Sequence, residues 1–320
     1  MKKIAVIAHA GKSMGGGLGE LREALAAAGV SDPYWTEVPK SKYAPERVEK
    51  ALAKGAETVF VWGGDGMVQR CVDVLAGTDA RLAILPAGTA NLFASNLEIP
   101  DDIEEAVAVG LEGRERRLDV GKINGEHFAV MAGAGLDARM MRDTDGGPKD
   151  KYGRLSYIWA ASRNLRTEPF KARIEVNGDL WYDDDATCLL FGNVGALFGG
   201  LEAFDDASPE DGQLEVGVTH ADSLGQWART VARTAVGSVG QSPFVQATKA
   251  ERVTVEFDRK ILYELDGGDR KEVKRLKVKV KPEALTVMIA QESTKLDEAA
   301  AEAEPTQETA EAPPAQEPAA

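Results

Sequence analysis

The stretch that decides the fold reads Val59-Phe60-Val61-Trp62-Gly63-Gly64-Asp65-Gly66-Met67. Its first four residues are all apolar, which is typical of a strand covered on both faces, as in a parallel sheet. Three glycines around one aspartate follow at once. Bare backbone is therefore expected at the carboxyl end of this strand, where doubly wound sheets bind their ligands.

The residue types in this turn indicate phosphate chemistry. Glycine lets an anion approach the main chain, and the N–H groups that open the following helix point at phosphate oxygens. Asp65 would repel a phosphate unless a cation intervenes, so its position predicts either Mg²⁺ or a proton-handling role. The alternative that needs no ligand is a tight strand-to-helix turn with a capping aspartate.

A second turn of similar composition follows the next strand-like run and reads Leu85-Pro86-Ala87-Gly88-Thr89-Ala90-Asn91. Gly88, the Thr89 hydroxyl and Asn91 offer uncharged hydrogen-bond donors, which suits a phosphate or a ribose. Because this turn also follows a strand, we expect the two turns to converge on one crevice.

The sequence around these turns alternates between strand and helix patterns. We expect strands at 4–8, 58–62 and 81–85, and helices at 18–28, 45–54, 67–75 and 101–110. This alternation predicts a parallel sheet with helices on both faces.

From about residue 117 onward, short strand-like runs dominate and turn pairs such as Asn124-Gly125 and Asn177-Gly178 separate them. We expect strands at 118–122, 127–132, 172–176, 187–191, 214–219, 252–257, 276–280 and 284–290, and helices at 153–165 and 223–239. Asp183-Asp184-Asp185 is predicted to form an acidic hairpin tip that faces solvent. The pattern as a whole favours an antiparallel β-sandwich.

These patterns predict three parts of the chain. An α/β domain covers 1–118, and residues 276–290 are candidates to return to it. A β-sandwich covers 119–275. The acidic segment 291–320 is predicted to be disordered, because it is rich in Ala, Glu, Pro and Gln and has too little apolar surface to bury.

Composition excludes several classes of protein. The 320 residues carry a net charge of −14, and phosphate backbones need clustered Lys and Arg, so no nucleic-acid partner is expected. Cys71 and Cys188 lack CxxC spacing, which argues against a disulfide framework and predicts a reducing, cytoplasmic compartment. The longest apolar runs are too short for a membrane-spanning helix.

The two turns together carry a family resemblance. The GGDG motif after a buried strand, followed by Pro-x-Gly-Thr-x-Asn-x-Phe-Ala at 86–94, resembles the diacylglycerol kinase catalytic domain family, which includes bacterial lipid kinases, sphingosine kinases and ceramide kinases. Further family-like segments extend the resemblance over about residues 4–290: Gly133 to Ala138, Tyr152 to Tyr157, Asn193, Gly199-Gly200 and Asp211 to Leu214. The resemblance implies a phosphofructokinase- and NAD-kinase-like nucleotide domain followed by an antiparallel β-sandwich, with ATP and lipid meeting in the cleft.

The resemblance also implies a role for particular residues. The ATP phosphates and their metal would be handled by Gly63, Gly64, Asp65 and Gly66, and the nucleotide site would be completed by Gly88, Thr89, Asn91 and, within reach of phosphate, Lys12. Asp266, in Asp266-Gly267-Gly268, matches the family's proposed general base. Asp211 is the candidate ligand of a structural Mg²⁺, and Asp119 matches an aspartate linked to the water network of that metal.

The sequence departs from the family at several of these positions. Gln69-Arg70 stands in place of Asn-Glu, Leu92 in place of an aspartate, and Gly268 in place of a glutamate. Met67 occupies a position that is threonine in many members, and His9-Ala10-Gly11-Lys12 stands where an Asn-Pro turn is usual.

The function implied by the resemblance is an ATP- and Mg²⁺-dependent lipid kinase that converts diacylglycerol to phosphatidate. Such a protein would be cytoplasmic and would touch the inner face of the membrane peripherally, where its substrate lies. Two alternatives remain open: a kinase for a soluble substrate, such as NAD kinase, and a nucleotide-binding regulatory protein that has lost catalysis. The acceptor lipid and the oligomeric state are left open by the sequence, and a homodimer is one of the open states.

Overall fold

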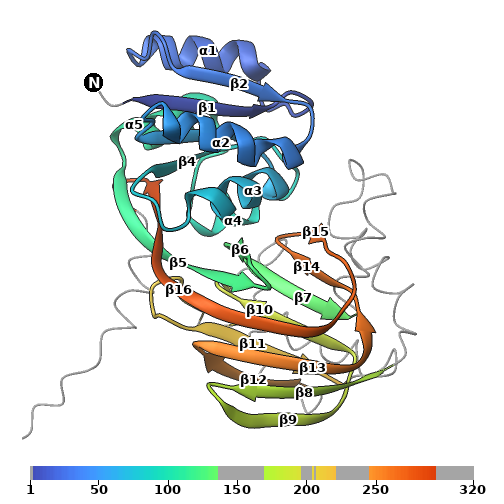
Figure 1. Ribbon diagram of the computed structural model, residues 1–320. Helices are drawn as coiled ribbons and strands as arrows, with labels where there is room; N and C mark the ends of the chain where they lie inside the picture. The colour runs from blue at the N-terminus through green and yellow to red at the C-terminus, as the bar shows by residue number, and fades with distance from the viewer. Residues whose placement is uncertain (1–2, 136–168, 196–203, 205–206, 221–244, 293–320) are drawn as a thin grey trace, which may run out of the picture.

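The computed structural model describes residues 3–135, 169–195, 204, 207–220 and 245–292 of the chain (Figure 1). The helices expected at 153–165 and 223–239, the family-like segments at 136–138, 152–157 and 199–200, and the acidic residues 293–320 lie outside the described residues. Among the described helices, none has the length and the apolar character that a membrane span requires.

The first part of the chain forms four parallel strands in the order β2-β1-β3-β4. The elements of this part are β1 (Ile4–His9), α1 (Gly17–Ala27), β2 (Tyr34–Val38), the 3₁₀ turn η1 (Ser41–Tyr43), α2 (Ala44–Ala53), β3 (Thr58–Gly63), α3 (Asp65–Leu75), β4 (Arg81–Pro86), α4 (Leu92–Asn96) and α5 (Ile103–Glu112). α1 lies beside α5, and α2 lies beside α3. Every residue of β3 is buried, so the prediction of a strand covered on both faces is confirmed.

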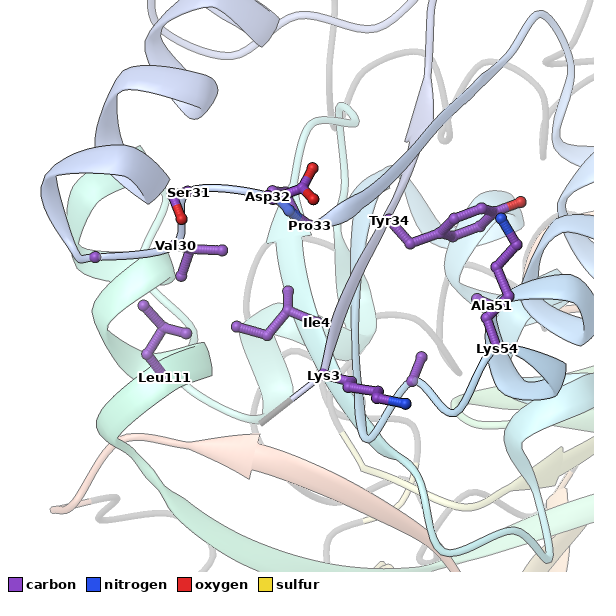
Figure 2. Close-up of a pocket in the computed structure, with 12 residues that line it drawn as sticks. Lys3, Ile4, Val30, Ser31, Asp32, Pro33, Tyr34, Ala51, Lys54 and Leu111 are labelled. Carbon is purple, nitrogen blue, oxygen red and sulfur yellow. The ribbon is translucent and has the colours of Figure 1, made fainter. Parts of the chain in front are cut away.

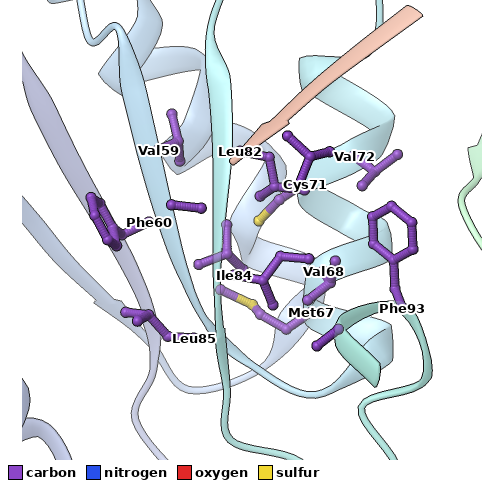
Figure 3. Close-up of a cluster of buried hydrophobic side chains, with 14 of the residues drawn as sticks. Val59, Phe60, Met67, Val68, Cys71, Val72, Leu82, Ile84, Leu85 and Phe93 are labelled. Carbon is purple, nitrogen blue, oxygen red and sulfur yellow. The ribbon is translucent and has the colours of Figure 1, made fainter. Parts of the chain in front are cut away.

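Packing of α3 on β3 and β4 fixes the direction of the helix that follows the GGDG motif. Met67, Cys71 and Val72 are at most 1% exposed and point from α3 toward the sheet, and Phe93 of α4 lies against the same helix (Figure 3). Each buried side chain of this size contributes about 1.5–3 kcal/mol relative to an exposed one. The start of α3 is therefore held rigidly at the end of β3.

The second part is a β-sandwich. Its strands are β5 (Arg114–Ile123), β6 (Glu126–Phe128), β7 (Met131–Gly135), β8 (Phe170–Val176), β9 (Asp179–Ala186), β10 (Cys188–Gly192), β11 (Leu214–Thr219), β12 (Val245–Ala250), β13 (Arg252–Ile261), β14 (Tyr263–Leu265), β15 (Gly268–Asp269) and β16 (Val273–Ile289). One antiparallel sheet has the order β12-β11-β10-β7-β14-β15. Phe191 and Leu214 of this sheet share a core with Phe170 and Ile174 of the other, so the predicted sandwich is confirmed.

The larger sheet is continuous through both parts of the molecule, in the order β2-β1-β3-β4-β16-β13-β8-β9. β16 pairs antiparallel with β13 near its start and parallel with β4 near its end, and β5 runs antiparallel alongside it (Figure 1). The prediction of two strands at 276–280 and 284–290 was wrong, because they form one strand of 17 residues. The expected gap at 281–283 is a register shift between Lys281 and Leu285, with Glu283 at φ +48°, which bends the strand without ending it.

The prediction that Asp183-Asp184-Asp185 forms a hairpin tip was also wrong. These residues lie in β9, an edge strand, where Asp183 pairs with Arg173 and Asp185 with Lys171 of β8. The Arg173 Nη1 to Asp183 Oδ2 distance is 2.8 Å. The tip of this hairpin is Asn177-Gly178, with φ values of +53° and +106° that suit these two residue types. Charges along a sheet edge discourage pairing with another chain.

Candidate functional site

The two glycine-bearing turns meet at the carboxyl edge of the parallel sheet. Gly63 ends β3 beside Pro86, which ends β4, and the amide of Ala87 donates to the Gly63 carbonyl at 3.0 Å. A Cβ atom built on Gly88 would lie 2.5 Å from the Cα of Gly64, closer than any real side chain allows. Glycine is required at position 88 because the two backbones touch there, and the predicted convergence of the two turns is present in the structure.

Asp65 joins these two turns. It opens α3, yet the structure shows no side-chain cap on that helix, whose N-cap residue is Gly64. Its Oδ1 instead accepts a hydrogen bond of 3.3 Å from the amide of Phe93 in α4. Burial raises the pKa of Asp65, although the amides of Phe93, Leu92 and Asn91 oppose that shift. The carboxylate therefore bridges the two turns and does not cap its own helix.

Asn91 shapes the second turn through hydrogen bonds to Gly88. It adopts a left-handed conformation, with φ of +48°. Its Oδ1 accepts from the Gly88 amide at 2.8 Å, and its Nδ2 donates to the Gly88 carbonyl at 3.1 Å. The polar groups of Gly88 and Asn91 thus satisfy each other, whereas Thr89 and Gly66 are exposed beside them. The structural role of Asn91 is not visible in the sequence, because it depends on the turn's own geometry.

The turn that carries Lys12 lies at the same edge of the sheet. The Gly11 amide donates to His9 Nδ1 at 3.1 Å, and the Lys12 amide donates to the His9 carbonyl at 3.1 Å. The indole Nε1 of Trp62, next to the GGDG motif, donates to the Lys12 carbonyl at 3.2 Å. Burial and the charge of Lys12 together lower the pKa of His9. The structure therefore brings the backbone of Lys12 next to the end of β3, with its side chain exposed.

Asp266 is held by the backbone that joins β6 to β7, and β7 is the neighbour of β14 in the same sheet. It lies in the turn between β14 and β15 with φ of +44° and is 6% exposed. One carboxylate oxygen accepts from the Ala129 amide at 2.8 Å, and the other accepts from the amides of Val130 and Met131, both at 2.9 Å. An ionised carboxylate has about four acceptor positions. Three are filled by the chain, so about one remains for another donor.

The electrostatics connect Asp266 with the GGDG turn. Burial raises the pKa of Asp266 to about 6; the three amides lower it in part, and the negative charge of Asp65 raises it further. The structure thus brings together Asp65 and the glycines of both turns, and the effect of the Asp65 charge indicates that Asp266 lies within electrostatic range of them.

Several residues that depart from the family pattern form one network that sequence reasoning missed. Glu126 of β6 accepts from Arg70 at 3.0 Å and from Arg270 at 2.8 Å. Arg270 also donates to the side chain of Gln69 at 3.2 Å and to the carbonyl of Gly268 at 2.8 Å. A Cβ atom at Gly268 would lie 3.0 Å from Arg270 Nη1, so the guanidinium occupies the space that a side chain at 268 needs. Arg70 and Arg270 both pair with Glu126, and these ion pairs hold α3 against the hairpin that bears Asp266.

The predicted ligands of a structural metal are already engaged by the chain. Both carboxylate oxygens of Asp119 accept backbone amides, from Gly212 at 2.7 Å and from Glu283 at 2.8 Å. Asp211 accepts from Lys249 Nζ at 2.9 Å. Burial lowers the pKa of Lys249, but its hydrogen bonds to the carboxylates of Asp211 and Glu215 outweigh burial and raise this pKa overall. No group of three His, Cys, Asp or Glu side chains among the described residues is arranged to hold a metal ion.

Asp65 fits the different requirements of the Mg²⁺ that accompanies ATP. Such an ion is bound by one or two carboxylates and otherwise by phosphates and water. A single carboxylate between two glycine turns meets that description, whereas Asp211 is already paired with the Lys249 ammonium.

A separate cavity of about 510 Å³ lies at the opposite edge of the parallel sheet. Ile4 and Tyr34 begin β1 and β2 there, and Lys3 and Lys54 reach toward the same opening (Figure 2). Because the glycine turns follow the carboxyl ends of the strands, this cavity is not part of the site described above.

Comparison with known proteins agrees with this geometry. Residues 3–123 match the family model of the diacylglycerol kinase catalytic domain, and residues 130–289 match that of the YegS C-terminal NAD kinase beta sandwich-like domain. A diacylglycerol kinase of Mycobacterium tuberculosis is 32% identical over 213 residues, which are 64% of this chain and 69% of that protein.

Two solved structures share the fold. The crystal structure of a diacylglycerol kinase from Bacillus anthracis covers 90% of this chain and 97% of its own, with a TM-score of 0.73 and 24% identity. The structure of yeast NADH kinase complexed with NADH covers 94% of this chain and 87% of its own, with a TM-score of 0.54 and 11% identity. The fold agrees with the two matched family models and with the relative from Mycobacterium tuberculosis. This chain therefore belongs to the diacylglycerol kinase catalytic domain family.

Proposed function

We propose that this protein is an ATP-dependent lipid kinase that transfers the γ-phosphate of ATP to a hydroxyl of a membrane lipid, with diacylglycerol as the acceptor and phosphatidate as the product. One observation carries the proposal: the backbone contact between Gly64 and Gly88, which brings the two glycine-bearing turns together at the end of the sheet. A bare-backbone surface with two carboxylates of raised pKa suits a polyphosphate and a hydroxyl acceptor.

The ATP phosphates would bind along the first turn. The amides at Gly64 and Gly66 open α3, and the N-terminus of a helix favours an anion. Lys12 lies on the neighbouring turn, where its ammonium group adds positive charge at the same edge of the sheet. Asp65 would hold the Mg²⁺ that accompanies ATP; when bound, this ion neutralises the charge on the phosphate oxygens.

Asp266 would act as the general base. Its remaining acceptor position takes the proton of the lipid hydroxyl, whose oxygen forms a bond to the γ-phosphorus as the bond to ADP breaks. A pKa of about 6 leaves the carboxylate ionised at neutral pH while keeping it more basic than an ordinary aspartate. Its three amide bonds fix the direction of the carboxylate, so positioning supplies much of the rate.

The acceptor also suggests where the protein works. A lipid hydroxyl lies at the membrane surface, so we place the protein in the cytoplasm, in peripheral contact with the inner face of the membrane. Both cysteines are buried and neither forms a disulfide, as suits a reducing compartment.

The decisive experiment measures transfer of radiolabel from [γ-³²P]ATP to vesicles that contain diacylglycerol, sphingosine or ceramide, with NAD as a soluble acceptor in parallel. We expect labelled phosphatidate from the diacylglycerol vesicles. Labelling of sphingosine or ceramide alone would keep the reaction class and change the acceptor. Labelling of NAD alone would replace the lipid kinase with a soluble-substrate kinase, and ATP binding without any transfer would favour a regulatory protein that has lost catalysis.

A further inference from the structure

A lysine lies between two carboxylates beside the turn that precedes β11. Lys249 of β12 is the direct cross-strand partner of Glu215 in β11. Its Nζ lies 2.9 Å from Asp211 Oδ2 and 3.1 Å from Glu215 Oε1. The side chains of Asp211 and Glu215 are only 14% and 10% exposed, so both charges are largely removed from water. An ammonium group in this position offsets the cost of burying the two carboxylates.

Other carboxylate oxygens around this turn accept backbone amides. Asp211 Oδ1 accepts from the Gln213 amide at 2.9 Å. Asp119 accepts from Gly212 of the turn and from Glu283 of β16, and the Asp119 amide itself donates to the Pro209 carbonyl at 2.7 Å. The turn is thereby tied to β5 and β16, the two strands that run through both parts of the molecule.

This arrangement does not fit the structural Mg²⁺ that the family resemblance implies. Mg²⁺ needs six oxygen ligands in an octahedron at about 2.0–2.1 Å. Asp211 Oδ2 is bound to an ammonium group, which repels a second cation, and each oxygen of Asp119 already accepts one backbone amide.

We propose that the Lys249 ammonium is the permanent cation of this turn, so that the joint between the turn, β5 and β16 is held without a divalent metal. Lys249 does for the Asp211–Glu215 pair what a bound metal would otherwise do, and it does so from a neighbouring strand whose register is fixed by sheet pairing. The need for Mg²⁺ is then confined to the ion that accompanies ATP. This inference concerns the fold and does not rest on the identity of the lipid.

The test compares thermal unfolding of the full chain, without nucleotide, in EDTA and in millimolar Mg²⁺. The wild-type chain is expected to have the same Tm in both. Lys249→Met should lower the Tm in EDTA by about 2–4 °C or more, and Mg²⁺ should raise it again, because two buried carboxylates are left without a cation. Lys249→Arg keeps the charge and should remain indifferent to EDTA.

Lys50→Met is the matched control, because Lys50 forms an exposed pair with Glu46 at 2.5 Å in α2 and its loss should leave the Tm unchanged in both media. The proposal is overturned if the wild-type chain gains a saturable Mg²⁺ stabilisation that Asp211→Asn abolishes, if Lys249→Met keeps the wild-type Tm, or if its Tm ignores Mg²⁺. Should Lys249→Met yield no folded protein, the wild-type chain decides: indifference to EDTA supports the proposal, and a loss of Tm in EDTA overturns it.

Discussion

At the scale of single residues, Gly66 and Gly88 are glycines for different reasons. A side chain at 88 collides with the backbone of Gly64, whereas a Cβ at Gly66 meets nothing within 4 Å. The fold itself therefore leaves room for a methyl group at position 66. If the phosphates of ATP lie against this backbone, only the ligand forbids that methyl group.

Gly66→Ala is accordingly expected to keep or raise the free energy of unfolding, by up to about 1 kcal/mol, because alanine favours the helix. The Kd for ATP should rise about tenfold or more, since the methyl group blocks the approach of the phosphates. Gly19→Ala, in the first turn of α1, is the matched control, because it also has free space and should leave the Kd unchanged. Equal ATP affinities in both variants, measured by calorimetry, would place the phosphates elsewhere.

The ionisation of Asp266 makes a second prediction at this scale. If Asp266 is the general base, its ionised carboxylate is the active form, so kcat/KM should rise with pH and reach half of its maximum at about pH 6. The folded chain holds this proton more tightly than the unfolded chain, whose pKa is near 3.8. The contribution of Asp266 to the free energy of unfolding therefore falls as the pH rises from about 4 to 6.

Asp266→Asn should reduce kcat by about 10²–10⁴-fold and leave the Kd for ATP nearly unchanged, because the base acts in the chemical step. Asparagine offers one acceptor oxygen to three amides, so the variant also loses about 1–3 kcal/mol of stability, and its Tm must be recorded to show that it folds. Asp269→Asn, at the exposed neighbouring position, should keep its turnover. Substantial turnover by a folded Asp266→Asn variant would contradict the assignment.

At the scale of elements, the Glu126 carboxylate connects α3 with the β14–β15 hairpin. Arg70 comes from the helix that begins at the GGDG motif, and Arg270 follows the turn of Asp266. The side chain of Arg270 is 8% exposed, so it depends on its partners for its position. We expect Glu126 and Arg270 to act as positioning residues, because they connect the two ends of the site and need not touch a substrate.

Glu126→Gln should reduce kcat, by up to about 100-fold, because a small displacement of the base misaligns the reacting groups. The KM for ATP should change little, since the glycine turns stay in place. Glu115→Gln, which removes the more exposed pair with Arg81, serves as the control and should keep the wild-type kcat. A Glu126→Gln variant that loses stability but keeps kcat would reduce the network to a structural one.

At the scale of the whole molecule, one sheet unites the two parts of the chain. β16 pairs with β13 in the sandwich and with β4 in the α/β part, and Leu285 of this strand is fully buried. Loss of β16 would leave β4 in one part and β13 in the other with an unpaired edge. The two parts should therefore unfold together.

Calorimetry of the full chain is expected to show one cooperative transition. Leu285→Ala should shift all of it, at a cost of about 2–5 kcal/mol for the cavity that it leaves. Leu180→Ala, at a side chain that is 52% exposed in β9, should change the free energy of unfolding by less than about 0.5 kcal/mol. Two separate transitions, of which Leu285→Ala moves only one, would show that the parts unfold independently.

The sequence by itself determined the features that depend on near neighbours. The buried run before the GGDG motif, the helix that follows it, the second turn and the hairpins at Asn124-Gly125 and Asn177-Gly178 are all specified by local periodicity and by residues that tolerate particular φ values. The division of the chain at 118 and 275 and the roles of the site residues stay predictions.

Only the tertiary structure decided how distant segments complete one another. The carboxylate of Asp266 finds its donors more than 130 positions away, at Ala129 to Met131. The same holds for the end of β16 beside β4 and for the guanidinium of Arg270 in the space above Gly268. Local patterns specify backbone conformation, whereas these contacts arise from which strand lies next to which, and that order is set by burial of the whole core.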